Sequence, residues 1–420
     1  MKHLLTLLLF SALCLLPLAG NQALAIKAGT VHTISGPSLE NAVILVKNGL
    51  ITAIGPELEI PADHLVLDYS GLQVYPGLIN AMTSLGLSDT ASLRMLNDST
   101  ESGDFNPDLE AAAAFYPWSK LIPIARSHGI LLALSIPAGG LVSGNAVLSR
   151  LYGWQPQDMT VQRRAAMIIR FPAGPAGMMG RRTDTDPETR SKKVNELLEF
   201  MRKAQAYHRK VQAGQRIKPD SRLAAMADTW TARLPVIAVA DSAADIKAAI
   251  KMGRDFELNL IIQGAYEAES CLKEIKESGF PVIVSSLYSG NRSWDDGYDK
   301  VYRLPAALHR AGIPFAFSSS AAAGSFDLPI QAGRAVAFGL PHQEALQALT
   351  LNPARFFSLT EHGAVAVGRR ADLVITDGDI LESSTLVRGI IIDGKPVKDL
   401  DYFQSEKARA AGSISGEYRE

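Results

Sequence analysis

The chain has 420 residues, of which 47% are hydrophobic and 20% are charged, and it carries 42 Lys and Arg against 43 Asp and Glu. This composition excludes a disordered or fibrous chain and favours one large α/β domain with a smaller companion. The formal net charge of −1 gives no indication of binding to nucleic acid, and we expect none.

The first 25 residues have the pattern of a secretory signal peptide. Lys2 precedes an apolar run over residues 4–18, and Ala23-Leu24-Ala25 ends the segment with a small-x-small motif. The run is shorter than the roughly 20 residues that a spanning helix needs, so we expect no integral membrane segment. The sequence therefore predicts a periplasmic or secreted protein that begins at Ile26 after cleavage, with an uncleaved N-terminal anchor as the alternative.

The two cysteines fit this interpretation. Cys14 lies within the signal peptide, so the mature chain keeps Cys271 alone and forms no internal disulfide. Export without disulfides is typical of a large bacterial domain whose core is sufficient by itself.

Short alternating runs separated by turn residues predict a small antiparallel β domain built from both ends of the chain. Residues 26–72 form its N-terminal part, where Asn48-Gly49 and Ser70-Gly71 lie between strand-like runs as in hairpins. The same pattern returns in residues 355–400, the expected C-terminal part of the domain, and residues 401–420 are expected to form a tail.

Residues 73–354 alternate apolar strands with longer helical segments and predict a (β/α)8 TIM barrel in an α/β protein. Strands that are apolar throughout are buried on both faces, as in a parallel sheet covered by helices. We expect the eighth strand within residues 141–160. The other seven are VYPGLIN, GILLALSIP, AAMIIRFP, LPVIAVAD, LNLIIQG, PVIVSSL and PFAFSSS.

Helix boundary signals support the alternation. Asp186-Pro187 predicts the start of a long helix that runs to about Val211. Ser242 and Asp245 form a capping-box pattern directly after a predicted strand, and a later helix is expected to end near Gly279.

On these features, the chain resembles the amidohydrolase superfamily, especially its imidazolonepropionase-like members, over nearly all of residues 26–398. The resemblance rests on the order of several phrases: NGLITAIG, PGLIN at the start of the first barrel strand, LNPARFFSL, VGRRADLVITDG and IIDGKPV. It implies a barrel with a composite β domain and, in the family default, a hydrolase that uses zinc or another divalent metal.

The resemblance fails at the metal ligands. Family members usually place a His-x-His pair after the proline-glycine turn, because alternate residues of a strand point the same way and hold one metal jointly. The matching residues are Met82 and Ser84, and Asn80 stands where aspartate is common. The later ligand positions of the family match Val239, Gly264 and Ser320. These side chains do not replace imidazole and carboxylate ligands, so we predict no metal and no other cofactor.

The histidines support this prediction independently. None of the eight lies two, three or four residues from another, so the sequence offers no local zinc motif. We expect surface or capping roles for those outside the signal peptide, including His362.

Polar residues remain at the predicted strand ends, where barrels of this kind carry their function. Hydroxyls and amides suit a small neutral polar ligand. Asp241 is the only carboxylate among them and is the candidate for any catalytic role, while Ser242 is expected to be an N-cap. No serine has a histidine or lysine base at a neighbouring strand end, which argues against a serine nucleophile. The ligand-binding candidates are Asn80, Met82, Ser84, Asp241, Gln263, Trp294 and Ser320.

Three hypotheses follow. In the first, the protein is an exported amidohydrolase relative without metal-dependent activity, acting as a ligand-binding or partner subunit in a homo-oligomer or in a hetero-oligomer with an intact amidohydrolase. In the second, it hydrolyses C–N bonds other than peptide bonds with unconventional residues such as Asp241. The third is a scaffold without ligand, favoured if Met82 and neighbouring apolar side chains fill the barrel mouth.

Overall fold

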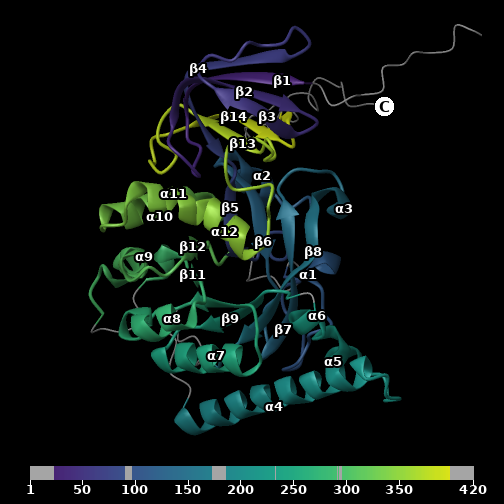
Figure 1. Ribbon diagram of the computed structural model, residues 1–420. Helices are drawn as coiled ribbons and strands as arrows, with labels where there is room; N and C mark the ends of the chain where they lie inside the picture. Colours follow the sequence, from purple (N-terminus) through teal and green to yellow (C-terminus); the bar gives the residue numbers. More distant parts are fainter. Residues whose placement is uncertain are drawn as a thin grey trace, which may run out of the picture.

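Two sheets organise the chain in the computed structural model, which describes residues 23–89, 97–172, 186–231, 233–290, 292 and 296–397. One sheet has seven strands in the order β15-β14-β13-β4-β1-β2-β3, and the other has eight in the order β12-β11-β10-β9-β8-β7-β6-β5. In Figure 1 the seven-stranded sheet lies at the top, the barrel sheet lies below it, and the long helix α4 crosses the opposite end. The predicted combination of a barrel and a composite β domain is confirmed.

The β domain joins strands from both ends of the chain. Strand β4 pairs in parallel with β1 on one side and antiparallel with β13 on the other, which ties the C-terminal segment to the N-terminal one. The predicted hairpin at Asn48-Gly49 connects β2 to β3, and both of its residues have the positive φ that such tight turns require. The strands are β1 (Leu24–Val31), β2 (Leu39–Lys47), β3 (Leu50–Gly55), β4 (Leu65–Pro76), β13 (Leu373–Thr376), β14 (Val387–Ile392) and β15 (Lys395–Pro396).

The hairpin predicted at Ser70-Gly71 is wrong. Strand β4 runs through this dipeptide without reversing, and its register with β1 shifts there. Gly71 has a φ of +89°, and Gly29 faces it so closely that a Cβ on Gly29 would lie 2.9 Å from the Gly71 nitrogen. The glycines therefore form a bulge between two parallel strands, so the β domain is not purely antiparallel.

The predicted signal-peptide cleavage site lies inside β1. Leu24 pairs with Val46 and with Leu65, and Leu24 and Ala25 are both buried. The carbonyl of Ala23 also accepts a hydrogen bond from the Leu65 amide (2.9 Å). A cut after Ala25 would thus remove buried residues of the sheet.

We expect a chain that begins at Ala23 to be more stable than one that begins at Ile26, by about 2 kcal/mol, because full burial of a leucine side chain is worth roughly that much. Urea unfolding of the two purified chains measures the difference. Equal unfolding free energies would show that the first residues of β1 contribute nothing to the sheet. N-terminal sequencing of the protein isolated from the producing cells shows at which residue its chain begins.

The barrel sheet departs from a regular (β/α)8 pattern at one strand. Strand β7 lies within the range predicted for the eighth strand, but it pairs antiparallel with both β6 and β8, whereas the other neighbours pair in parallel. The chain reverses directly between β6 and β7, so no helix covers that connection. The strands are β5 (Leu78–Thr83), β6 (Ile130–Ser135), β7 (Val142–Arg150), β8 (Thr160–Arg170), β9 (Val236–Ala240), β10 (Leu260–Gly264), β11 (Val282–Val284) and β12 (Phe315–Phe317).

The predicted helix signals are confirmed. The Asp186 carboxylate caps α4, Ser242 caps α7, and α8 ends at Gly279 in the left-handed conformation. The helices are α1 (Ala111–Ala114), α2 (Leu121–Ser127), α3 (Pro156–Met159), α4 (Pro187–Gln212), α5 (Ser221–Ala225), α6 (Asp228–Thr231), α7 (Ala243–Asp255), α8 (Leu272–Ser278), α9 (Lys300–Ala311), α10 (Leu328–Ala337), α11 (His342–Leu349) and α12 (Leu351–Phe356). Within the described residues, no helix is long and apolar enough to span a bilayer.

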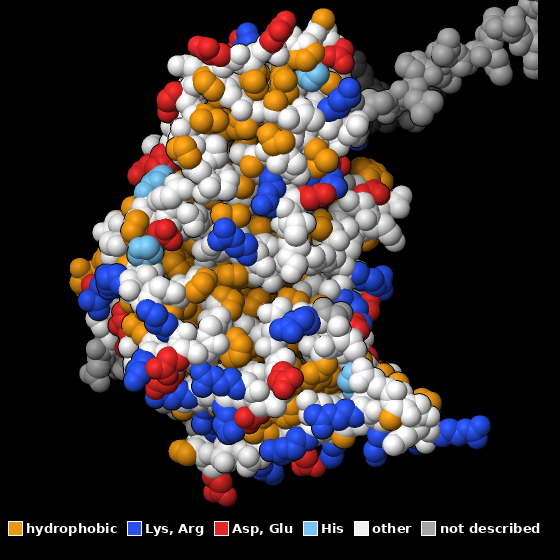
Figure 2. All heavy atoms as spheres, in the orientation of Figure 1, with side chains coloured by type: hydrophobic (Ala, Val, Ile, Leu, Met, Phe, Trp, Pro, Cys, Tyr) orange, Lys and Arg blue, Asp and Glu red, His pale blue; other side chains and the backbone are white. Residues whose placement is uncertain are grey.

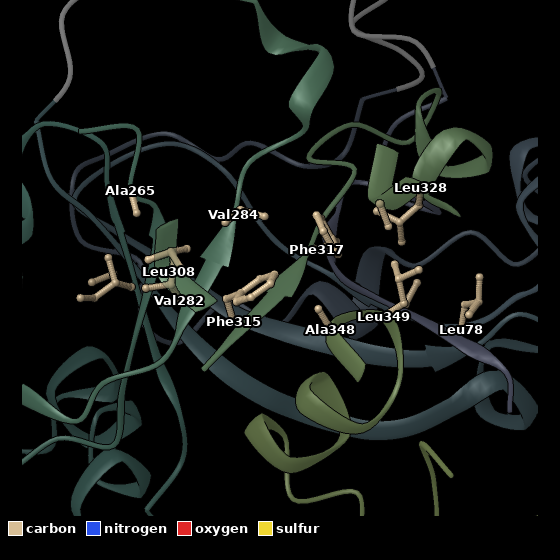
Figure 3. Close-up of a cluster of buried hydrophobic side chains, with 14 of the residues drawn as sticks. Leu78, Ala265, Val282, Val284, Leu308, Phe315, Phe317, Leu328, Ala348 and Leu349 are labelled. Atoms are coloured by element: carbon tan, nitrogen blue, oxygen red, sulfur yellow. The ribbon is translucent and has the colours of Figure 1, made fainter. Parts of the chain in front are cut away.

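Alternate residues of the barrel strands point to two different cores. One set packs outward against the helices, and Figure 3 shows Phe315 and Phe317 of β12 beside side chains of α10 and α11. The other set faces the barrel interior and receives at least one apolar side chain from every barrel strand. Cys271 is buried in the outer core and forms no disulfide with any described residue.

An ion pair connects α11 to the loop that follows β13. The His342 Nε2 lies 2.6 Å from Asp379 Oδ2, and this hydrogen bond raises the pKa of His342 above its ordinary value of 6.5. A raised pKa means that the pair stabilises the fold fully below pH 6.5 and loses its effect as the pH rises through the raised value.

We expect His342→Gln to lower the free energy of unfolding by less than about 1 kcal/mol at pH 6, since the imidazole is 43% exposed and screened by solvent. The difference from the unmodified protein should shrink toward zero in alkaline solution. Urea unfolding at several pH values measures it, and Asp379→Asn should give the same profile. A difference that grows with pH would contradict the assignment.

Candidate functional site at the barrel mouth

The predicted site residues lie at the C-terminal ends of the parallel barrel strands. Strands β5 and β12 are the two edges of the sheet, and they meet where the Ser320 amide donates to the Met82 carbonyl (3.1 Å). Ser320 has a φ of +61°, a backbone conformation that residues other than glycine rarely adopt. The barrel mouth is therefore closed by contacts among the predicted residues themselves.

Asn80 completes this closure with its side-chain amide. The Nδ2 donates to the hydroxyls of Ser319 (2.7 Å) and Ser325 (3.3 Å), and the Oδ1 accepts from the Ser319 amide (3.2 Å). The Met82 amide also points at Oδ1, at 3.4 Å. Asn80 is fully buried, so its hydrogen-bonding capacity is used inside the protein, between β5 and the loop after β12.

Met82 fills the upper end of the barrel interior. Its side chain is 5% exposed and belongs to the interior apolar cluster, together with Val239 from β9. At the other end Phe357 and Leu359 close the same cluster. Two positions that match metal ligands of the family are thus part of a continuous hydrophobic core.

The hydroxyl and amide candidates make hydrogen bonds within the protein. Ser84 Oγ accepts from the Ala322 amide (3.1 Å), and Ser320 Oγ accepts from the Ser286 amide (3.2 Å). Gln263 is 2% exposed and donates to Ser285 Oγ (3.1 Å). These side chains hold the loops that follow β5, β10, β11 and β12 against one another.

Asp241 forms an ion pair that the sequence did not reveal. Its Oδ2 lies 2.8 Å from Arg292 Nη1, and the two side chains are 14% and 23% exposed. Gly264, at the end of β10, has a φ of +99°, and a Cβ at that position would collide with Asp241 Oδ1. The carboxylate therefore occupies the space beside β10 where the family's histidine side chain would begin.

Arg292 is held by a network of aromatic and charged groups. Its guanidinium lies over the ring of Tyr266, 4.4 Å from the centroid, and its amide donates to the Tyr266 hydroxyl (2.9 Å). That hydroxyl in turn donates to Asp296 (2.5 Å), which also pairs with Lys300. Burial, with a contribution from Asp296, raises the pKa of Tyr266 to about 12, so the phenol keeps its proton.

The sequence alone did not identify Arg292, because it lies in the polar segment YSGNRSWDDGYDK. Its acidic partner, Asp241, follows β9 and lies 51 positions earlier in the chain. Trp294, the aromatic candidate in the same segment, lies outside the described residues. Positive and negative side chains are interspersed on the face shown in Figure 2.

The barrel mouth does not fit a catalytic metal. The residues at the family's ligand positions are a buried methionine, serines whose hydroxyls already bond to backbone amides, a valine and a glycine, whereas zinc needs imidazole, thiolate or carboxylate ligands. In the described part of the chain, no group of three or more His, Cys, Asp and Glu side chains is placed to hold a metal ion. The residues present therefore disagree with the metal chemistry that the family resemblance implies.

Comparisons with known proteins agree with the fold. The sequence model of the amidohydrolase family matches residues 234–406. The amidohydrolase of Thermotoga maritima has a similar structure, with a TM-score of 0.80 and 24% identity over 89% of this chain and 99% of that one. The barrel and the composite β domain thus define an amidohydrolase fold. The chain therefore has the fold of the amidohydrolase superfamily, and its residues 234–406 match the amidohydrolase family.

Among curated relatives, amidohydrolase tasK of Hapsidospora irregularis is 21% identical over 388 residues, which are 84% of this chain and 39% of tasK. An adenine deaminase of Oleidesulfovibrio alaskensis is 35% identical over 81 residues, 19% of this chain and 14% of the deaminase. The chain thus spans about two fifths of the length of tasK, and less of the deaminase.

Proposed function

We propose that this amidohydrolase-superfamily protein is exported, has no metal-dependent hydrolase activity, and serves as a ligand-binding or partner subunit. The observation that supports the proposal is the set of structural contacts that the residues aligned with the family's ligand positions make at the barrel mouth. Met82 and Val239 extend the apolar interior, and the Asp241 carboxylate lies against Gly264. A metal at this place would lack ligands and would displace buried apolar side chains.

The filled interior also limits where a ligand binds. The hydroxyls of Ser84 and Ser320 are engaged with neighbouring loops, so a molecule at the mouth would meet the outer network around Arg292 rather than the barrel interior. A filled barrel interior favours a partner or scaffold role over the binding of a substrate in a deep pocket.

The metal content of the purified protein tests the proposal. After dialysis against trace zinc and manganese, we expect less than about 0.1 metal per chain by elemental analysis. A sample treated with EDTA provides the baseline. One or two tightly held metals per chain would contradict the proposal and would support a metal hydrolase with ligands different from those assigned here.

The alternative function is hydrolysis of C–N bonds without the family's metal set, and Asp241 is the residue that supports it. If an assay panel finds activity, Asp241→Ala should abolish it, because Asp241 is the only carboxylate among the predicted strand-end candidates. Asp255→Ala, on the exposed end of α7, is the control that should leave the rate unchanged. An unchanged rate in Asp241→Ala would remove this carboxylate from the mechanism.

The partner version has its own test. Co-expression with an intact amidohydrolase should give a complex that elutes as one species in size-exclusion chromatography. Separate elution of the two chains would rule out the hetero-oligomer with that amidohydrolase, and the mass of the isolated protein would then distinguish a homo-oligomer from a monomer.

A further inference from the structure

A polar cavity lies at the opposite end of the barrel from the mouth. Strand β7 runs antiparallel to its neighbours, so its last residue, Arg150, reaches the floor of the barrel beside Thr160, the first residue of β8. Residues 361–370, which lead from α12 to β13, cover this floor. The cavity measures about 330 Å³ and is lined by side chains that include Arg150, Asp158, Thr160, Glu361, His362 and Arg370.

Arg150 has unused hydrogen-bonding capacity in this cavity. Its side chain is 19% exposed, and its nearest ionic contact is a long one, 3.7 Å from Nη1 to Asp393 Oδ2. Among the described residues, no acceptor reaches its buried Nε. The guanidinium of Arg150 is therefore a cavity-lining cation that no carboxylate of the described residues pairs with closely, so an occupant that accepts hydrogen bonds would find a free charge there.

His362 lines the same cavity, and its ring is positioned by the buried Asp372 carboxylate. It is 7% exposed, so the surface or capping role expected from its sequence position is wrong. Its Nδ1 lies 3.0 Å from Asp372 Oδ2, while Asp372 Oδ1 accepts the Asp393 amide (2.6 Å). With Nδ1 facing the carboxylate, Nε2 is the ring nitrogen left for a ligand.

Two acidic side chains complete the cavity wall. Asp158 accepts a hydrogen bond from the Gln155 amide (3.1 Å), and Glu361 pairs with Arg370 (2.8 Å) while remaining 47% exposed. Arg370 also pairs with Asp393. Arg150 is therefore the arginine of the cavity whose guanidinium can still pair with a ligand carboxylate. The cavity thus presents a cation without a close partner and two carboxylates to the same volume.

From this arrangement we propose that the cavity binds a small zwitterion of the α-amino acid class. The ligand carboxylate pairs with the Nη atoms of Arg150, a bidentate geometry that guanidinium favours, and accepts from His362 when that ring donates. The ligand ammonium lies toward Asp158 and Glu361. This site is separate from the barrel mouth and does not depend on the proposed function.

Calorimetric titration of the purified protein with L-alanine tests the proposal, with acetate and methylamine as probes that carry one charged group each. We expect L-alanine to bind at least about tenfold more tightly than either probe, since only the zwitterion meets both signs of charge. Arg150→Gln should weaken L-alanine binding by at least about tenfold. Arg292→Gln, which removes an arginine of similar exposure (23%) at the barrel mouth, should leave it unchanged.

A second variant keeps the test valid if Arg150→Gln does not fold. Glu361→Gln alters an exposed carboxylate and should weaken L-alanine binding while leaving acetate binding unchanged or tighter. The proposal is overturned if L-alanine does not bind at millimolar concentration, if acetate binds as tightly, or if Arg292→Gln rather than Arg150→Gln abolishes binding.

Discussion

Replacing Asn80 with alanine is expected to lower the free energy of unfolding by about 3 kcal/mol. The change removes a buried amide that donates to Ser319 and Ser325 and accepts from the Ser319 amide, and it leaves those groups without partners at the seam between β5 and β12. Each buried polar group left unsatisfied costs about 1–3 kcal/mol, so the losses exceed those of a typical substitution. Urea unfolding followed by circular dichroism measures the effect.

Asn259→Ala provides the matched control. This asparagine is half-buried and donates one hydrogen bond, to the Arg233 carbonyl (3.2 Å), so its loss should cost about 1 kcal/mol or less. If Asn80→Ala were no more destabilising than Asn259→Ala, then Asn80 would not hold the barrel closed, and a role in ligand binding would regain support.

Replacing Asp372 with alanine is expected to have an effect of similar size, about 3 kcal/mol at neutral pH. The carboxylate is 8% exposed, and its removal leaves the buried His362 ring and the Asp393 amide without their partner. Breaking a buried pair costs more than the pair itself contributes, because the remaining group stays desolvated.

The pH dependence of this effect follows from the carboxyl group. Burial alone would raise the pKa of Asp372, but the His362 side chain and the Asp393 amide lower it below its ordinary value of 3.8. Because its pKa is lowered, the ionised Asp372 carboxylate stabilises the fold above pH 3.8. This stabilisation is lost as the pH falls through the lowered pKa and the carboxylate becomes protonated.

The unmodified protein should therefore lose more stability on acidification than Asp372→Asn, which has no charge to lose. Urea unfolding of the two proteins between neutral pH and pH 3 measures this difference. Parallel profiles would show that the Asp372 charge does not contribute to stability.

The candidate site could be predicted from the sequence only in part. The sequence predicts that Met82 and Ser84 do not act as metal ligands, because a thioether and a hydroxyl differ from imidazole in any surroundings. The structural contacts that these residues make could not be predicted from the sequence. Met82 belongs to the same interior cluster as Val239, which is distant in sequence, and the pairing of Asp241 with Arg292 requires the loop after β11 to return over β9.

The sequence by itself determined the strands, the helix caps and the composite β domain. Apolar runs and capping residues such as Asp186 and Ser242 act through local geometry, so their meaning does not depend on the rest of the fold. The tertiary structure alone decided the direction of β7, the continuity of β4 through Gly71, and the burial of His362 beside Asp372. These features depend on contacts between segments far apart in the chain, and neither side-chain periodicity nor turn residues encode which segments meet.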